Sequence, residues 1–130
     1  MKIGLWAPLG GFTFYYSRGE WDRMIADFTS AGLTLVQLSG ELLDEALEAP
    51  AQIPALRARL AEHGLSIAAL GAYKNITALD PEKCRRNVDY VRACLEHAVE
   101  LGTPVVSTET GTLHPTGDWS DTPDNATPAA

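Results

Sequence analysis

Polar and apolar positions alternate along the chain in a repeated order: a helical stretch, a glycine, then a short apolar run. The glycines at these junctions are Gly32, Gly64 and Gly102. Glycine readily adopts the left-handed conformation that ends a helix. One strand with its crossover helix needs about 30 residues or more, which fits the spacing of these glycines. The pattern therefore predicts consecutive βα units.

The expected strands are nearly continuous apolar runs that end near Trp6, Leu38, Leu70 and Thr108. Such runs are typical of a parallel sheet whose outer face is covered. Right-handed crossovers then predict the strand order 1-2-3-4, with helices on one side only. Helices are expected over residues 19–31, 53–63 and 81–101. The apolar stripe expected to face the core in the third helix is Val88, Val91, Leu95 and Val99.

The last residues of the chain have the pattern of a helix start, with Thr127 as the cap and Pro128 as the first helical residue. Three residues cannot form a helix alone, so the sequence predicts a domain, residues 1–130, that is truncated at its fourth helix. The predicted fold class is α/β, the N-terminal half of a TIM (β/α)8 barrel with about four βα units. A small flavodoxin-like domain is an alternative, although such a domain usually has acidic residues where this chain has Ala7-Pro8-Leu9.

Charge, apolar content and cysteines disfavour several classes of function. The 130 residues carry a net charge of −7, which disfavours nucleic-acid binding because that binding depends on Lys and Arg. The chain begins without the apolar segment of a signal peptide and has no apolar run long enough for a membrane span. Cys84 and Cys94 fall in one expected helix, where they point in different directions and cannot be bridged. We therefore expect a cytoplasmic protein with reduced thiols and no membrane partner.

Candidate chemistry is sought in the loops that follow the strands, because ligands of parallel α/β folds bind there. Glu109 follows the fourth strand by one residue and could bind a sugar hydroxyl, bind a metal or act as a base. The alternative role is a carboxylate paired with a neighbouring group that holds the loop. Trp6, Tyr73 and His114 lie on the same side and complete the predicted substrate-binding set, since aromatic rings suit the apolar face of a sugar.

No metal site is predicted within this chain, because Glu109 and His114 are too few ligands for one. The sequence also lacks a P-loop, a dinucleotide-binding glycine motif and a nucleophile elbow.

The segment TPVVSTETGTL at residues 103–113, with PTGDW and DNATP after it, resembles the fourth strand and loop of xylose-isomerase-like barrels. The opening KIGLW and the Ala31-Gly32 junction are also similar to this family, the sugar phosphate isomerases and epimerases. The family includes enzymes that act at abasic sites in DNA. That branch uses histidines on early loops, which this chain does not have after its second or third expected strand.

The resemblance implies a ketose/aldose-type isomerase or epimerase of small sugars or sugar phosphates that depends on a divalent metal (Mn, Mg, Zn or Co) in the complete barrel. The metal ligands of the family come from the second half of the barrel, so this chain is expected to be an incomplete and inactive half. Whether it is an enzyme at all is left open. The alternative is a non-catalytic half barrel that assembles with a partner or with itself through exposed strand edges.

Overall fold

Four parallel strands form one sheet in the order β1-β2-β3-β4. The computed structural model describes residues 4–6, 16–117 and 122–126, the first range as backbone only. The strands are β1 (Gly4–Trp6), β2 (Leu35–Ser39), β3 (Ser66–Gly71) and β4 (Val106–Ser107). The predicted order is confirmed, and each strand ends within one residue of its predicted end. A flavodoxin-like sheet would place β1 between β2 and β3, so that alternative is wrong.

The helices are α1 (Trp21–Ser30), α2 (Gly40–Glu48), α3 (Ile53–Glu62) and α4 (Pro81–His97), with short 3-10 turns at Pro50–Gln52 and Pro123–Ala126. The three predicted helices are confirmed. The junction glycines Gly32, Gly64 and Gly102 have φ angles of 70°, 72° and 90°, as the left-handed helix ends require. Sequence reasoning missed α2, which occupies the segment taken as the loop after β2.

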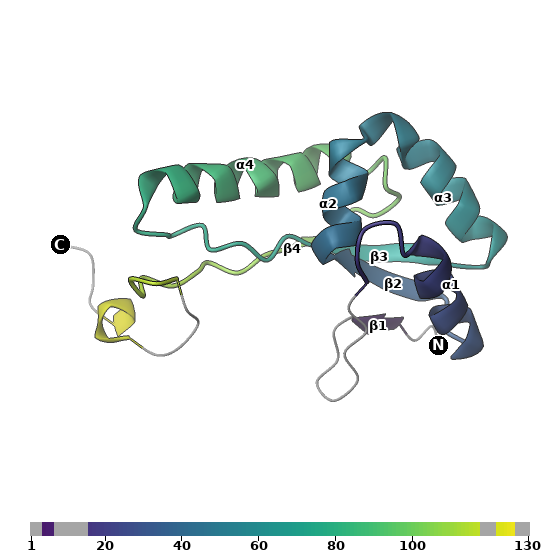
Figure 1. Ribbon diagram of the computed structural model, residues 1–130, viewed down its shortest axis with the longest axis horizontal. Coiled ribbons are helices and arrows are strands. Elements are labelled where there is room, and N and C mark those ends of the chain that lie inside the picture. The colour runs from purple at the N-terminus through teal and green to yellow at the C-terminus, as the bar shows by residue number, and fades with distance from the viewer. Residues whose placement is uncertain (1–3, 7–15, 118–121, 127–130) are drawn as a thin grey trace.

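One face of the sheet makes the core. Val36 and Leu38 of β2 and Leu70 of β3 are buried there against helix residues such as Met24 and Leu43. Figure 1 shows the helices gathered on this side of the strands. The residues that alternate with Val36 and Leu38 are only half-buried, so the other face of the sheet is open. In a closed barrel that open face is the interior.

The prediction that Val88, Leu95 and Val99 face the core is wrong: these side chains are 37%, 59% and 77% exposed. The fully buried residue of α4 is Cys94, with Tyr90 and Val91 packed against the core. At about 100° per residue, the apolar positions of α4 span about half of the helix circumference: one face carries Tyr90, Cys94 and Val91, and the adjacent face carries Leu95, Val88 and Val99. A sequence pattern marks both faces as apolar but cannot say which of them meets the sheet.

The fourth helix expected to start at Thr127 lies outside the described residues. Among the described helices, none has both the length and the apolar character to cross a membrane.

Candidate functional site at the carboxyl ends of the strands

The pairing of the strands brings polar side chains together on the open face of the sheet. Ser39 of β2 pairs with Gly71 of β3, and Gly71 pairs with Ser107 of β4. Gln37, two residues before Ser39, lies on the same face and pairs with Trp6 of β1. Aligned residues of neighbouring parallel strands point to the same side of a sheet, so these positions line one wall at the carboxyl ends of the strands.

Gly71 sits at the centre of this wall. A Cβ atom placed there would lie 2.7 Å from Cε2 of Tyr73, 2.9 Å from Cβ of Ser39 and 3.0 Å from Nε2 of Gln37. The Gln37 amide donates a hydrogen bond to the Tyr73 hydroxyl above this glycine. A side chain larger than hydrogen would therefore displace the Tyr73 ring. Gln37, Ser39 and Tyr73 form a close-packed set that we call the inner-wall cluster.

The loop after β4 is fixed by Asn75, which is only 7% exposed. Its Nδ2 donates to the Thr112 carbonyl at 2.8 Å, and its Oδ1 accepts from the Thr112 amide at 3.1 Å. The same Oδ1 accepts from the amide and hydroxyl of Thr77. A Cβ on Gly111 would lie 2.0 Å from that oxygen, so the loop comes this close only because residue 111 is glycine. The β3–α4 loop thus holds the β4 loop in place.

Of the predicted substrate-binding residues, Tyr73 lies in the inner-wall cluster. Trp6 ends β1 beside Gln37, but its side chain lies outside the described part of the structure. Glu109 is exposed two residues beyond Ser107, and its carboxylate has no hydrogen-bond or ion-pair partner among the described residues. The alternative role of Glu109, a paired carboxylate that holds the loop, therefore finds no support among the described residues. Asn75 holds the loop instead. Whether Glu109 binds substrate stays a prediction.

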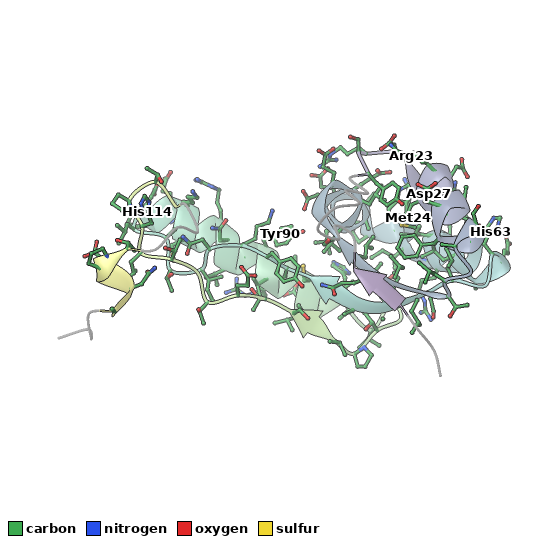
Figure 2. The ribbon with its side chains drawn as sticks, turned by 90° about the horizontal axis from the view of Figure 1, so that it is seen from below. Arg23, Met24, Asp27, His63, Tyr90 and His114 are labelled. Carbon is green, nitrogen blue, oxygen red and sulfur yellow. The ribbon has the colours of Figure 1, made fainter. Side chains whose placement is uncertain are left out.

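The structure does not bring His114 to the inner-wall cluster. Its Nδ1 lies 2.9 Å from the Thr116 hydroxyl, and nearby Gly117 packs close to Lys83 at the start of α4. Figure 2 shows His114 at the end of the molecule opposite His63, with Tyr90 between them. A role of His114 in substrate binding therefore stays a prediction.

Gln37 and Ser39 are the functional candidates that sequence reasoning missed. A signal was present: both are polar residues in an otherwise apolar strand, at alternate positions near its carboxyl end. Alternate positions share a face, so a polar pair there indicates a face that does not belong to the core.

Ionisable groups also meet behind the sheet, between α2 and α4. The Tyr90 hydroxyl bonds to Asp44, and both burial and this carboxylate raise the pKa of Tyr90. Burial, followed by the charge of Asp44, raises the pKa of the Cys94 thiol to about 11. The Lys74 ammonium lies 4.2 Å from the centre of the Tyr90 ring. Lys74 thus points toward Tyr90 of α4.

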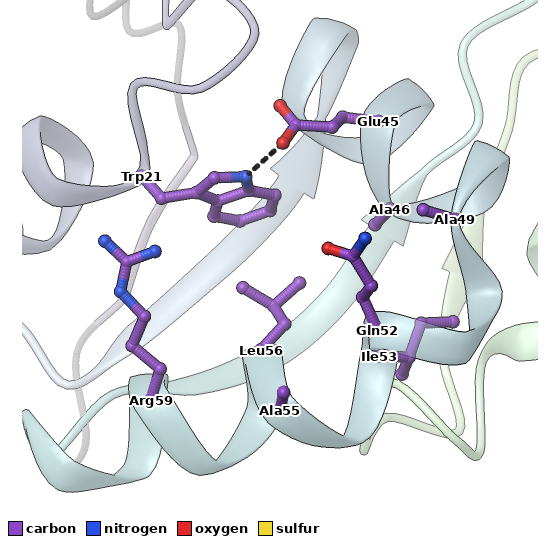
Figure 3. Close-up of a pocket in the computed structure, with 9 residues that line it drawn as sticks. All are labelled: Trp21, Glu45, Ala46, Ala49, Gln52, Ile53, Ala55, Leu56 and Arg59. Carbon is purple, nitrogen blue, oxygen red and sulfur yellow. Dashed lines mark hydrogen bonds between the residues drawn. The ribbon is translucent and has the colours of Figure 1, made fainter.

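A groove of about 550 Å³ opens among α1, α2 and α3 (Figure 3). Its charged groups already have partners within the fold. Glu45 accepts from Trp21 Nε1 at 3.1 Å and from the Gly19 amide at 2.7 Å, and Arg59 pairs with Asp22. These bonds join the helices to one another in the layer that covers the sheet. We therefore place the candidate site at the inner-wall cluster.

Comparison with known families agrees with this geometry. The family model described as xylose isomerase-like TIM barrel matches residues 25–129. The chain belongs to the xylose isomerase-like TIM barrel family. The match covers β2, β3 and β4 with their loops, and therefore the whole inner-wall cluster. A comparison with curated proteins finds no match. The xylose isomerase-like family supplies the fold of a sugar isomerase or epimerase, in which the open face becomes the barrel interior.

A divalent metal, which the xylose isomerase-like fold implies, does not fit the described inner wall. The groups there are an amide, hydroxyls and a phenol, whereas Mg²⁺ and Mn²⁺ prefer carboxylates and Zn²⁺ prefers His and Cys. No three His, Cys, Asp or Glu side chains come together within the described ranges. Glu109 carries a carboxylate on the loop two residues beyond Ser107, and Glu41 carries one two residues beyond Ser39.

Proposed function

We propose that this chain supplies the substrate-binding wall of a sugar or sugar-phosphate isomerase or epimerase. The observation that carries the proposal is the inner-wall cluster, neutral and rich in hydrogen-bonding groups, at the carboxyl ends of parallel strands. Active sites of TIM barrels lie at this face. Membership of the xylose isomerase-like family supports a sugar as the ligand class.

The chemistry of the cluster suits a polyhydroxylated ligand. An amide such as Gln37 both donates and accepts, and serine and tyrosine hydroxyls do the same, so each can pair with a sugar hydroxyl in either role. The Tyr73 ring offers an apolar surface to the C–H groups of a sugar. Gly71 keeps the floor of the cluster free of side-chain bulk. The cluster would therefore orient a sugar and replace its water partners without adding charge.

Glu109, on the loop after β4, would also contribute to sugar binding. Its carboxylate can accept a hydrogen bond from a sugar hydroxyl, and Asn75 fixes the loop that carries it. A hydroxyl that loses its partner inside a water-excluded site is costly, by about 1–3 kcal/mol, so such a contact discriminates between substrates.

The wall alone does not supply the acid and base that isomerisation requires. Moving a proton between neighbouring carbons needs a group that removes it and a group that returns it. The inner-wall cluster has no carboxylate, histidine or lysine for this task. We therefore propose that the chain by itself has no isomerase activity, and that other parts of a complete barrel supply these groups and the metal.

Calorimetric titration with ketohexoses, aldopentoses and their phosphates tests the binding role. Gln37→Leu removes the polar atoms at nearly constant volume and should weaken sugar binding about 5-fold, the effect of one hydrogen bond of about 1 kcal/mol. Gln52→Leu is the matched control, because it makes the same change on the outer groove and should leave binding unaltered. No sugar binding, or equal loss in both variants, would contradict the proposal.

A titration with DNA distinguishes the proposed sugar binding from the DNA-acting function of the other branch of the family. A duplex with an abasic site should not bind, since the chain has a net charge of −7. Binding of that duplex, with no sugar bound, would replace the sugar proposal with the nuclease one.

A further inference from the structure

The segments that follow the strands carry few positive charges. Their basic residues are Arg18 after β1, Lys74 after β3 and His114 after β4. Strand β2 continues directly into α2 and adds none. Ligands of parallel α/β folds bind at these segments, and a phosphate group there usually binds to a cationic side chain or a helix N-terminus. The contacts of these three residues therefore indicate which ligand charge the site accepts.

The structure engages the two permanent cations among them within the chain itself. The Arg18 guanidinium forms an ion pair with Glu48 through two hydrogen bonds, of 2.6 and 2.5 Å. Glu48 is the last residue of α2, about 12 Å along the helix axis from the first. Lys74 Nζ lies 4.2 Å from the centre of the Tyr90 ring on α4. A phosphate could recruit Arg18 only by displacing Glu48, and Lys74 only by displacing Tyr90.

The helix N-termini that follow the strands carry carboxylates of the chain. Asp22 lies in the first turn of α1, Glu41 in that of α2 and Glu82 in that of α4. Asp80 also caps α4 by accepting hydrogen bonds from the Glu82 and Lys83 amides at 2.8 and 3.2 Å. Helix N-termini attract phosphate through their backbone amides. At each of these three helix ends, a phosphate would instead meet a negative side chain.

The inner-wall cluster itself is flanked by negative charge. Glu41 and Glu109 each lie two residues beyond a serine of the open face, and both are exposed. The cluster consists of an amide and two hydroxyl-bearing side chains, which are neutral. A phosphate monoester carries about −1.5 to −2 charges at pH 7, and here it would lose water without gaining a cationic partner. The hydroxyls of an uncharged sugar meet the same cluster with no charge to desolvate.

We propose that the inner-wall cluster binds an uncharged sugar and discriminates against sugar phosphates. This inference rests on the proposed function and narrows its ligand class. The discrimination comes from Glu41 and Glu109, which repel a phosphate, and from Arg18 and Lys74, which are engaged by α2 and α4. Phosphorylation of the same sugar therefore weakens its binding.

Calorimetry on the full chain with fructose and fructose 1-phosphate tests this inference. At pH 7.5 and low salt the sugar should bind about 10-fold or more tightly than its phosphate. Raising the ionic strength from about 20 mM to about 500 mM should reduce this ratio, because salt screens the repulsion, and should leave the Kd of the sugar unchanged. A phosphate that binds as tightly as the sugar overturns the inference and leaves the proposed sugar site standing. No binding of either ligand overturns the proposed function and the inference with it.

Two charge variants locate the source of the discrimination. Glu41→Gln keeps an acceptor for the Arg18 amide and removes one negative charge, so the ratio of the two Kd values should fall about 3-fold. Glu62→Gln is the matched control, because it removes the same charge from the last residue of α3, before the amino end of β3. It should leave the ratio unchanged, and circular dichroism checks the fold of both variants. An equal fall in both variants, or no fall in Glu41→Gln, overturns the proposal that carboxylates beside the cluster select the ligand charge.

Discussion

Replacing Asn75 with alanine is expected to release the β4 loop from the rest of the fold. The Asn75 side chain bonds to both the amide and the carbonyl of Thr112, a residue only 3% exposed. Alanine cannot replace either bond. Both backbone groups of Thr112 would then remain buried without a partner unless the loop moves outward to water.

The two backbone groups of Thr112 set the size of the expected loss in the free energy of unfolding. A buried backbone group that loses its partner costs about 1–3 kcal/mol, so two such groups would cost up to about 6 kcal/mol if nothing relaxed. Glu109 and Gly111 nearby are exposed or half-exposed, which allows water to enter as the loop shifts. We therefore expect a loss of about 2–3 kcal/mol in the free energy of unfolding. The loss of the bonds to Thr77 is included in this value.

Urea unfolding measures the loss of stability, and amide hydrogen exchange measures the release of the β4 loop. Asn75→Ala should lower the free energy of unfolding and remove the protection of the Thr112 amide. Asn125→Ala is the matched control: Asn125 also bonds to this loop, through the Leu113 amide at 2.8 Å, but is exposed, so water can replace it. The control should lose less than about 1 kcal/mol. Equal losses in the two variants, or a Thr112 amide that stays protected in Asn75→Ala, would refute the assigned role.

Three other predictions concern single side chains. In a complete barrel, Glu109→Gln should lower kcat/KM about 10-fold, or about 1.4 kcal/mol, with an unchanged Tm; normal kinetics with a lowered Tm would make Glu109 a structural residue. At pH 8 a thiol reagent should label half-exposed Cys84 first and buried Cys94, whose pKa is raised to about 11, only on unfolding; equal rates would contradict this burial. Hydrogen bonds from the backbone amides of Lys83 and Glu82 lower the pKa of the Asp80 carboxyl. The stabilisation from Asp80 is therefore present above the unfolded pKa near 3.8 and is lost as pH falls through the lower folded pKa. The Tm difference between wild type and Asp80→Ala should be full at pH 6 and shrink below pH 4.

The parallel sheet could be predicted because its signals are local. Gly32, Gly64 and Gly102 each end a helical segment just before an apolar run, and backbone sterics make that junction recognisable in sequence. Helix α2 could also have been found: Leu42, Leu43 and Ala46 have helical spacing, but the preceding Ser39-Gly40 suggested a loop.

The orientation of α4 and the composition of the site depend on contacts distant in sequence. Val88 and Leu95 have the same apolar character as Cys94, and only the position of the sheet determines which of them is buried. Gln37 meets Tyr73 across 36 residues because β2 and β3 pair side by side, with a register shift between Val36 and Gln37. Sequence placed Glu109 on the loop after β4. The bonds of Asn75 that fix this loop join residues 37 apart and have no local signature.

The central claim, that the open face at the strand ends binds a sugar, is tested most directly by a ¹⁵N NMR titration with a ketohexose and its phosphate. We predict that the Gln37 side-chain amide and the backbone amides of Ser39, Gly71 and Ser107 shift together along one saturating curve. The Trp21 indole N–H, in the outer groove, should not move and serves as the internal reference. Shifts confined to Trp21 and its neighbours, or an unchanged spectrum at 50 mM sugar, would contradict the claim.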